Sequence, residues 1–245
     1  MKINETIVAQ STAYGESAIA IIRLSGKNSI DIVNKLFPKK DLKKVNSHSI
    51  HFGNLEYKKK VIDEVLVSVF KAPKSYTKEN LVEISSHGSS YIIKTILSAT
   101  IDLGARIANK GEFTFRSFIN GNMDLSQAEA VADIISSKSK NSHRIAINHI
   151  KGVFSNKIKK LRKDLINFSS LLELELDFSE EDVEFANRTQ LNNNLDEIIS
   201  FSEIMIDSYK LNNVIKDGIG IIILGKPNVG KSTILNALLN EEKAI

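Results

Sequence analysis

The sequence predicts a mixed fold. An α+β domain is followed by an all-α helical bundle segment and then by the first strand, phosphate-binding loop and helix of an α/β domain. Short β-rich runs alternate with helical patterns as far as residue 118, and from residue 124 the apolar residues recur at helical spacing. Near the end of the chain, a glycine-containing loop joins an apolar run to another helical pattern. We expect domain boundaries at residues 1–118, 119–216 and 217–245.

The α+β domain is predicted from runs of β-branched residues that polar turns separate. Helices are expected where apolar residues share one face, and Pro38 and Gly104 end two of them. In chain order the predicted elements are strands Thr6–Ser11 and Ala18–Leu24, helix Ser29–Phe37, strands Ser49–Leu55, Val61–Phe70 and Leu81–Ser86, and helix Tyr91–Leu103.

The helical segment is predicted to begin with a capping box, because Asp124 precedes Gln127 by one helical turn at the start of an apolar stripe. One long helix should follow, with an apolar seam over Ile147–Leu172 that needs partner helices. After an acidic break at Ser179–Glu184, a further helix is expected over Gln190–Leu211. The middle of the chain should therefore form a helical bundle.

The loop GKPNVGKS, Gly225–Ser232, is the clearest functional signal in the sequence. Its pattern G-x-x-x-x-G-K-[ST] uses glycines so that backbone N–H groups can curl around phosphate oxygens. Lys231 would reach the outer phosphates, and Ser232 would offer its hydroxyl to Mg²⁺ at the positive end of the following helix. The apolar run Ile219–Leu224 before the loop is typical of a buried parallel strand. We predict that a nucleoside triphosphate binds through Asn228, Val229, Gly230, Lys231, Ser232 and Thr233.

The nucleotide domain is expected to be truncated, because only Thr233–Ile245 follow the loop. These residues contain no second Mg²⁺ ligand, no residue to position water and no base-reading motif. We therefore assign no catalytic residue and expect no hydrolysis from this polypeptide, which is interpreted as a fragment of a larger enzyme.

Composition excludes several classes of protein. The longest apolar runs fall short of a membrane span, and the N-terminus lacks the pattern of a secretory signal, so a cytoplasmic location without membrane contact is expected. With no cysteine, disulfides and thiolate metal sites are excluded. The net charge of +4 suggests weak attraction to polyanions, although lysine clusters are more often solvated loops. These clusters are Lys39, Lys40, Lys43 and Lys44, and Lys58, Lys59 and Lys60.

Five segments together resemble one protein family. They are TIVAQSTAYGESAIAIIRLSG, LVEISSHGS, GEFTFRSFINGNMDLSQAEAVADII, DFSEEDVEF and GKPNVGKS. In their order and spacing the chain resembles the MnmE (TrmE) tRNA-modification GTPases over essentially its whole length. The resemblance implies a folate-binding N-terminal domain, the first half of a helical domain, and the opening of a Ras-like GTP-binding domain that is inserted into the helical one.

The resemblance also implies an activity and partners. With the flavoprotein MnmG, such proteins use a tetrahydrofolate one-carbon unit to add an aminomethyl-type group to carbon 5 of the wobble uridine of certain tRNAs. GTP hydrolysis rearranges the complex, and family members pair through the N-terminal domain, which implies a homodimer and a heterotetramer with MnmG. The implied cofactors are GTP, Mg²⁺ at Ser232, K⁺ at Asn228, and 5-formyl- or methylene-tetrahydrofolate.

Three residues match folate-binding positions of the family: Arg23, Glu83 and Asn122. A guanidinium at Arg23 can pair with a carboxylate or bond to the pterin, although a surface ion pair is the alternative. The Glu83 carboxylate suits the adjacent donors of the pterin ring, with an exposed edge position as the alternative. Asn122 stands where many family members have lysine, so it cannot supply charge to a glutamate tail, and the preferred folate form stays open.

Two other functions remain open on the residues alone. The chain could belong to a phosphate-loop ATPase of another lineage, because no guanine-selecting motif lies within it. It could instead be a folate-binding dimerisation module without catalysis.

Histidines and a basic helix give weaker signals. His48 and His51 should face opposite sides of a strand, so a shared metal is not expected. His87 beside Gly88 fits either a turn or a ligand contact. The basic residues of the long helix could touch tRNA phosphates or form a solvated face; they are His143, Arg144, Lys151, Lys157, Lys159, Lys160, Arg162 and Lys163.

Overall fold

The computed structural model describes residues 4–137, 139–177, 188–217, 222–226 and 229–239. The chain divides into two compact units. The first comprises Met1–Ser136 with Ile145–Asn156, and the second comprises Ser137–Arg144 with Lys157–Ile245.

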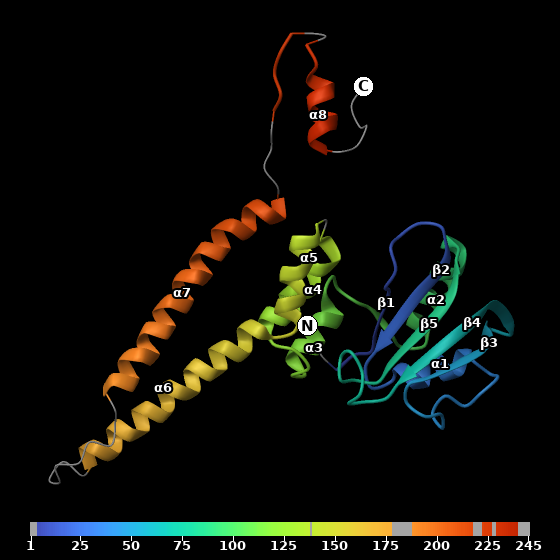
Figure 1. Cartoon of the computed structure of the whole chain (residues 1–245). Helices are drawn as coiled ribbons and strands as arrows, with labels where there is room; N and C mark the ends of the chain where they lie inside the picture. Colours follow the sequence, from blue (N-terminus) through green and yellow to red (C-terminus); the bar gives the residue numbers. More distant parts are fainter. Residues whose placement is uncertain (1–3, 138, 178–187, 218–221, 227–228, 240–245) are drawn as a thin grey trace. The chain divides into compact units, whose positions relative to one another are not determined.

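The first unit is built on a six-stranded sheet with the order β3-β4-β5-β2-β1-β6 (Figure 1). Neighbouring strands are antiparallel, except that β6 runs parallel to β1. The bounds are β1 Ile7–Gln10, β2 Ser17–Ser25, β3 Ser49–Tyr57, β4 Lys60–Phe70, β5 Leu81–Gly88 and β6 Arg106–Ile107. The five strands and two helices predicted for this domain are confirmed, with ends that shift by a few residues.

Side chains alternate across the sheet, so one face forms the core. Ile22 on β2, Val67 on β4 and Ile84 on β5 are fully buried in one cluster with residues of α1 and α2. These helices span Ser29–Leu36 and Ser90–Asp102. Arg23 and Glu83 are next to core residues in sequence and therefore lie on the opposite face, where polar side chains remain partly accessible.

Two elements of the first unit were not predicted. Strand β6 has only two residues and exists because it pairs with β1, a contact that leaves no local pattern. Helix α3, Glu112–Ile119, begins after Gly111 in a left-handed conformation with φ of 74°. It contributes the buried side chains Glu112, Arg116 and Ser117. A helix that buries charged residues does not show the apolar stripe on which the prediction depended.

The capping box at the start of α4, Leu125–Ser136, is confirmed. The Asp124 N–H donates to Gln127 Oε1 at 2.9 Å, and the Gln127 N–H donates to Asp124 Oδ1 at 3.0 Å. Each side chain satisfies a backbone donor that the helix start leaves unpaired. Gln127 also donates through Nε2 to the Ile150 carbonyl at 2.8 Å.

The single long helix predicted over Ile147–Leu172 is wrong. Helix α5 ends at Ile150, and α6 begins at Val153. Between them Gly152 has a φ of 70°, the left-handed conformation with which glycine ends helices. The seam is also covered unevenly, since Leu161 and Phe168 are buried whereas Ile158 and Leu165 remain exposed.

The second unit contains most of α6, together with α7, Arg188–Asp217, and α8, Lys231–Leu239. The strand predicted over Ile219–Leu224 does not form in its described part, because residues 222–224 carry no strand pairing. All strands of the described residues lie between Ile7 and Ile107, and residues 222–224 pair with none of them. The predicted acidic break at Ser179–Glu184 lies outside the described residues, as do residues 219–221.

Candidate functional site

Arg23 and Glu83, two of the predicted folate residues, lie side by side on the open face of the sheet. They are direct register partners on β2 and β5. Arg23 Nε donates to Glu83 Oε1 at 2.8 Å, and a terminal guanidinium nitrogen lies 2.7 Å from the same oxygen. The side chains are 27% and 23% exposed, so the pair is held in the sheet yet accessible. Because both contacts fall on Oε1, the other carboxylate oxygen of Glu83 is left as an acceptor.

Two aromatic rings flank the Arg23 guanidinium. Its central carbon lies 5.5 Å from the ring centre of Tyr76 and 5.7 Å from that of Phe113. These distances are within the range of cation–π attraction. Tyr76 comes from the β4–β5 connection and Phe113 from α3, so three separate segments converge on one charge. Neither ring was predicted; the aromatic residues of GEFTFRSF were the available signal for Phe113.

Asn122 joins this cluster through the backbone of Tyr76. Its Nδ2 donates to the Tyr76 carbonyl at 3.0 Å and lies 3.2 Å from Ser117 Oγ. The Ser117 hydroxyl donates to the same carbonyl at 2.6 Å. The structure thus brings all three sequence-predicted folate residues around Tyr76, with Asn122 contacting the loop rather than the Arg23–Glu83 pair.

A buried ion network supports the segments that carry the two rings. Glu112 and Arg116, both 2% exposed, are paired on α3 at 3.1 Å. Arg106 lies 2.7 Å from Glu112, and Arg116 lies 3.1 Å from Glu79. Glu79 also accepts a hydrogen bond from Ser25 at 2.7 Å. The network therefore ties α3, which holds Phe113, to the β4–β5 connection, which holds Tyr76, and to β2, which holds Arg23.

The network controls the protonation of Glu112. Burial by itself raises the pKa of this carboxyl, but hydrogen bonds from Arg106, the Asn109 backbone and Arg116 outweigh burial and lower the pKa to about 2. Glu112 is therefore ionised near neutral pH and acts as an acceptor for two guanidinium groups.

His48, His51 and His87 each contact a single serine or aspartate side chain. His87 Nδ1 lies 2.8 Å from Asp63 Oδ1, and its backbone N–H donates to the other oxygen of Asp63 at 2.8 Å. This arrangement fixes the end of β5, in keeping with a role at the turn. His48 and His51 bond instead to Ser47 and Ser49. Among the described residues, no group of three or more histidine or carboxylate side chains is placed to hold a metal ion.

The phosphate loop is described from Val229 onward and in residues 222–226, so Asn228 lies outside the described residues. Gly230 has a φ of 87° and directly precedes α8. The Lys231 ammonium donates to the Lys226 carbonyl at 2.7 Å, which places it over the loop. The Ile234 N–H donates to the Gly230 carbonyl at 3.0 Å, so the first turn of α8 forms directly after this glycine. The backbone donors of Lys231, Ser232 and Thr233 thus stand at the helix start, as phosphate binding requires.

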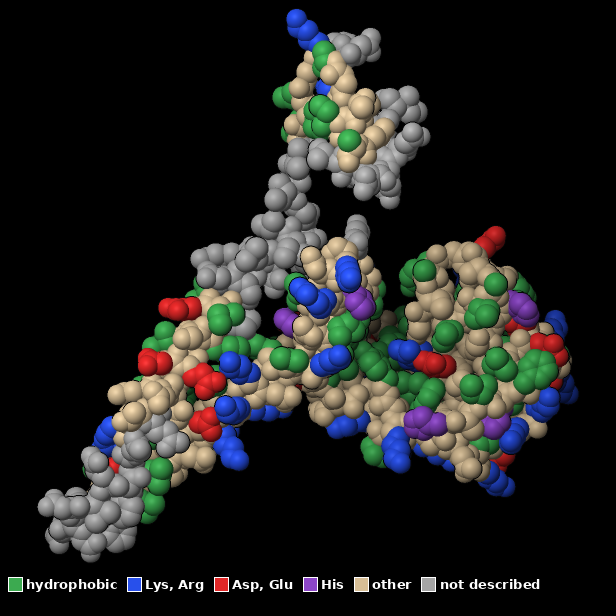
Figure 2. All heavy atoms as spheres, in the orientation of Figure 1, with side chains coloured by type: hydrophobic (Ala, Val, Ile, Leu, Met, Phe, Trp, Pro, Cys, Tyr) green, Lys and Arg blue, Asp and Glu red, His purple; other side chains and the backbone are tan. Residues whose placement is uncertain are grey.

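The basic stretch of α6 is partly neutralised within the second unit. Lys157 lies 3.8 Å from Glu197 and 4.9 Å from the ring centre of Phe201, both on α7. Figure 2 shows acidic and basic side chains close together over α6 and α7. These contacts favour the interpretation as a mixed, solvated face.

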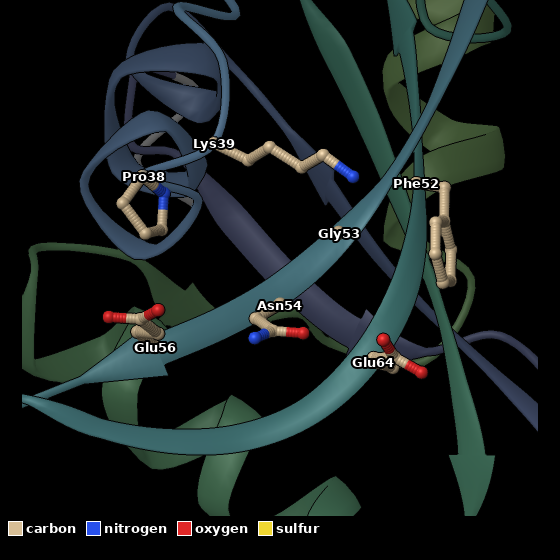
Figure 3. Close-up of a pocket in the computed structure, with 7 residues that line it drawn as sticks. All are labelled: Pro38, Lys39, Phe52, Gly53, Asn54, Glu56 and Glu64. Atoms are coloured by element: carbon tan, nitrogen blue, oxygen red, sulfur yellow. The ribbon is translucent and has the colours of Figure 1, made fainter.

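A separate pocket of about 470 Å³ lies over β3 and β4 (Figure 3). The Lys39 side chain runs across β3 at Gly53, and its ammonium lies 5.2 Å from the Phe52 ring centre. A Cβ at residue 53 would come within 2.7 Å of Lys39 and 2.9 Å of Phe37, so glycine permits this crossing. None of the predicted folate residues lines this pocket.

The fold and these sites define a class: an α+β sheet domain with an accessible arginine–carboxylate pair, joined to helices that lead to a phosphate-binding loop. Comparison with known families gives two matches, to the GTP-binding protein TrmE N-terminus over residues 6–122 and to the MnmE helical domain over residues 125–242. The chain belongs to the MnmE family of tRNA modification GTPases.

Curated relatives carry the same name, tRNA modification GTPase MnmE. The protein of Cytophaga hutchinsonii is 55% identical over 241 residues, which are 98% of this chain and 52% of that relative. The protein of Christiangramia forsetii is 55% identical over 248 residues, which cover 100% of this chain and 52% of that relative. The protein of Bacteroides thetaiotaomicron is 49% identical over 245 residues, which cover 98% of this chain and 52% of that relative. The chain therefore spans about half the length of the curated relatives it matches.

None of the helices in the described part of the chain combines the length and the apolar content that crossing a membrane requires.

Proposed function

We propose that this chain supplies the folate site and the start of the nucleotide site of a tRNA-modifying GTPase. In the complete protein, working with MnmG, a one-carbon unit from a tetrahydrofolate derivative would be built into the aminomethyl-type group on carbon 5 of the wobble uridine. The observation that carries this proposal is the Arg23–Glu83 pair flanked by Tyr76 and Phe113.

The residues present fit a pterin. Glu83 keeps one carboxylate oxygen as an acceptor for a ring N–H or amino group, and Arg23 keeps donor capacity beyond its bonds to Glu83. The rings of Tyr76 and Phe113 offer apolar faces to a flat heterocycle. When bound, the folate would supply the one-carbon unit, and the protein groups would orient its ring. Asn122 would act by holding the Tyr76 backbone, because its amide nitrogen is already bonded there.

The nucleotide residues fit a triphosphate in a similar way. The N–H groups of Lys231, Ser232 and Thr233 start α8, and Lys231 lies over the loop. We propose that GTP binds here with Mg²⁺ at Ser232 and K⁺ at Asn228, and that hydrolysis also requires parts of the protein outside this chain. A location in the cytoplasm accords with a tRNA substrate.

We also propose pairing through the first unit. Ile50, Phe52 and Leu66 lie on the open face of β3 and β4, and all three are exposed. Covering such apolar side chains would stabilise a homodimer, since burial of apolar area is the main favourable term in association.

Calorimetric titration of the chain with 5-formyltetrahydrofolate tests the folate site. We expect Arg23→Ala and Glu83→Ala each to weaken binding at least tenfold, because each removes one partner and leaves the other charge unpaired. Glu64→Ala, an exposed carboxylate on β4, is the matched control and should bind as the wild type does. Binding that is unchanged in both site variants would place the folate elsewhere.

A further inference from the structure

We propose that a cluster of lysines beside α1 binds the phosphodiester backbone of RNA. The lysine surface is defined here as Lys27, Lys40, Lys43, Lys44 and Lys71. This inference rests on the proposed function for the choice of RNA as the partner, and it assigns that partner to a surface remote in sequence from the nucleotide loop.

The lysine surface lines two neighbouring hollows of the first unit. Lys27, Lys43 and Lys71 border one of about 280 Å³, and Lys40 and Lys44 border another of about 420 Å³. The loop between α1 and β3 connects them, because Lys43 and Lys44 are consecutive. A strand of phosphates could therefore contact both hollows in succession.

The loop that carries Lys40, Lys43 and Lys44 is anchored, which distinguishes it from a solvated lysine-rich loop. Leu42 and Val45 are buried in the core cluster, with exposed fractions of 0% and 7%. The Leu42 N–H donates to Asn34 Oδ1 at 2.6 Å, and the Lys71 ammonium donates to the Lys43 carbonyl at 2.9 Å. Apolar anchors that alternate with lysines hold the backbone of this loop in place, which reduces the entropy lost on binding.

The charges of the lysine surface are not cancelled. Lys43 lies 2.6 Å from Asp31 and Lys44 lies 3.5 Å from Asp41, but both lysines remain exposed. In the described chain Lys27 and Lys40 have no carboxylate partner. The residues that line the two hollows thus include five lysines and only two carboxylates. Burial, together with the positive charge of Lys40, lowers the pKa of His51 at the rim, so this imidazole adds no charge near neutral pH.

The charge of the lysine surface suits a phosphate backbone. Lysine binds phosphate as a point charge, and five lysines line the two hollows. The relatives are named for modification of tRNA, an RNA whose backbone presents phosphates at regular spacing.

Binding of an unmodified tRNA transcript, followed by fluorescence anisotropy at several KCl concentrations, tests the proposal. The variant is Lys27→Ala with Lys40→Ala, which removes two charges without breaking an ion pair. We expect about a tenfold loss of affinity near 0.1 M KCl. The slope of the logarithm of the binding constant against the logarithm of the KCl concentration should become smaller in magnitude by about two. The control, Lys60→Ala with Lys94→Ala, removes the same charge from exposed residues outside both hollows and should keep the wild-type slope.

Lys27→Arg with Lys40→Arg should restore both the affinity and the slope, because the charge alone is required. Equal losses in the lysine-surface variant and the control, or no loss in either, would overturn the proposal. Binding to poly-glutamate or to phosphatidylglycerol vesicles that depends on these lysines, without binding to tRNA, would overturn it too. Titration of the same variants with 5-formyltetrahydrofolate separates this result from the proposed folate function, which the lysine changes should leave intact.

Discussion

Replacing Glu112 by glutamine should destabilise the first unit in a pH-dependent way. The carboxylate accepts hydrogen bonds from Arg106 at 2.7 and 3.1 Å and from the Asn109 N–H at 2.8 Å. It also accepts from Arg116 at 3.1 Å. Glutamine keeps the shape but loses the charge, so two guanidinium groups lose their shared partner. Arg116 is the more affected, because it is buried and its Nε already has no hydrogen-bond partner.

The magnitude follows from the pKa of Glu112. Its pKa is lowered in the folded state from 4.5 to about 2. This difference corresponds to about 3 kcal/mol of unfolding free energy. A lowered carboxyl pKa stabilises the fold at pH values above the unfolded pKa, and this contribution is lost as the pH falls through the folded pKa. The free energy of unfolding of Glu112→Gln should therefore lie about 3 kcal/mol below that of the wild type near neutral pH. This gap should shrink by about 2 kcal/mol by about pH 3.

Urea unfolding followed by tyrosine fluorescence measures this gap. The chain has no tryptophan and five tyrosines, of which only Tyr209 lies outside the first unit, so the signal reports that unit. Glu64→Gln, which neutralises an exposed carboxylate on β4, is the matched control and should unfold as the wild type does at each pH. A Glu112→Gln variant within about 0.5 kcal/mol of wild type, or a gap that stays constant with pH, would refute the role of the ionised carboxylate.

Two further substitutions test local packing and capping by the same urea assay. Gly53→Ala should destabilise the first unit by about 1 to 3 kcal/mol, because the added Cβ would lie 2.9 Å from the buried Phe37 ring. Adding Lys39→Ala should not restore stability, and full recovery in that double variant would show that only the flexible lysine is displaced. Asp124→Ala should cost about 1 kcal/mol through loss of the cap at α4, whereas Asp124→Asn should remain within a few tenths. Equal stability of the two Asp124 variants would contradict the capping role.

The elements of the sheet domain could be predicted because their signals are local. Alternating β-branched residues marked β2 to β5, and Pro38 and Gly104 marked the ends of the two helices. The break at Gly152 was missed because the apolar spacing continues across it, although a glycine inside a helical pattern was the available warning. The strand before the phosphate loop was predicted from an apolar run and its position directly before that loop, whereas a strand also depends on hydrogen-bonded neighbours.

The candidate site could be predicted only in part, because its contacts join distant segments. Arg23 and Glu83 were predicted from a family resemblance, and their direct pairing depends on the register of β2 with β5. No local pattern fixes that register. Tyr76 and Phe113 come from an irregular connection and from a helix that was not predicted, so their convergence on Arg23 emerges only from the structure.

Gln127 uses both ends of one side-chain amide. Its oxygen accepts from the Asp124 backbone and its nitrogen donates to the Ile150 carbonyl, so the start of α4 and the end of α5 depend on a single planar group. Glutamate has almost the same shape, but it would direct a negative oxygen at the Ile150 carbonyl oxygen and repel it. Tolerance to substitution at this position is therefore set by the polarity of the amide rather than by its volume, and a change there would loosen two helices at once.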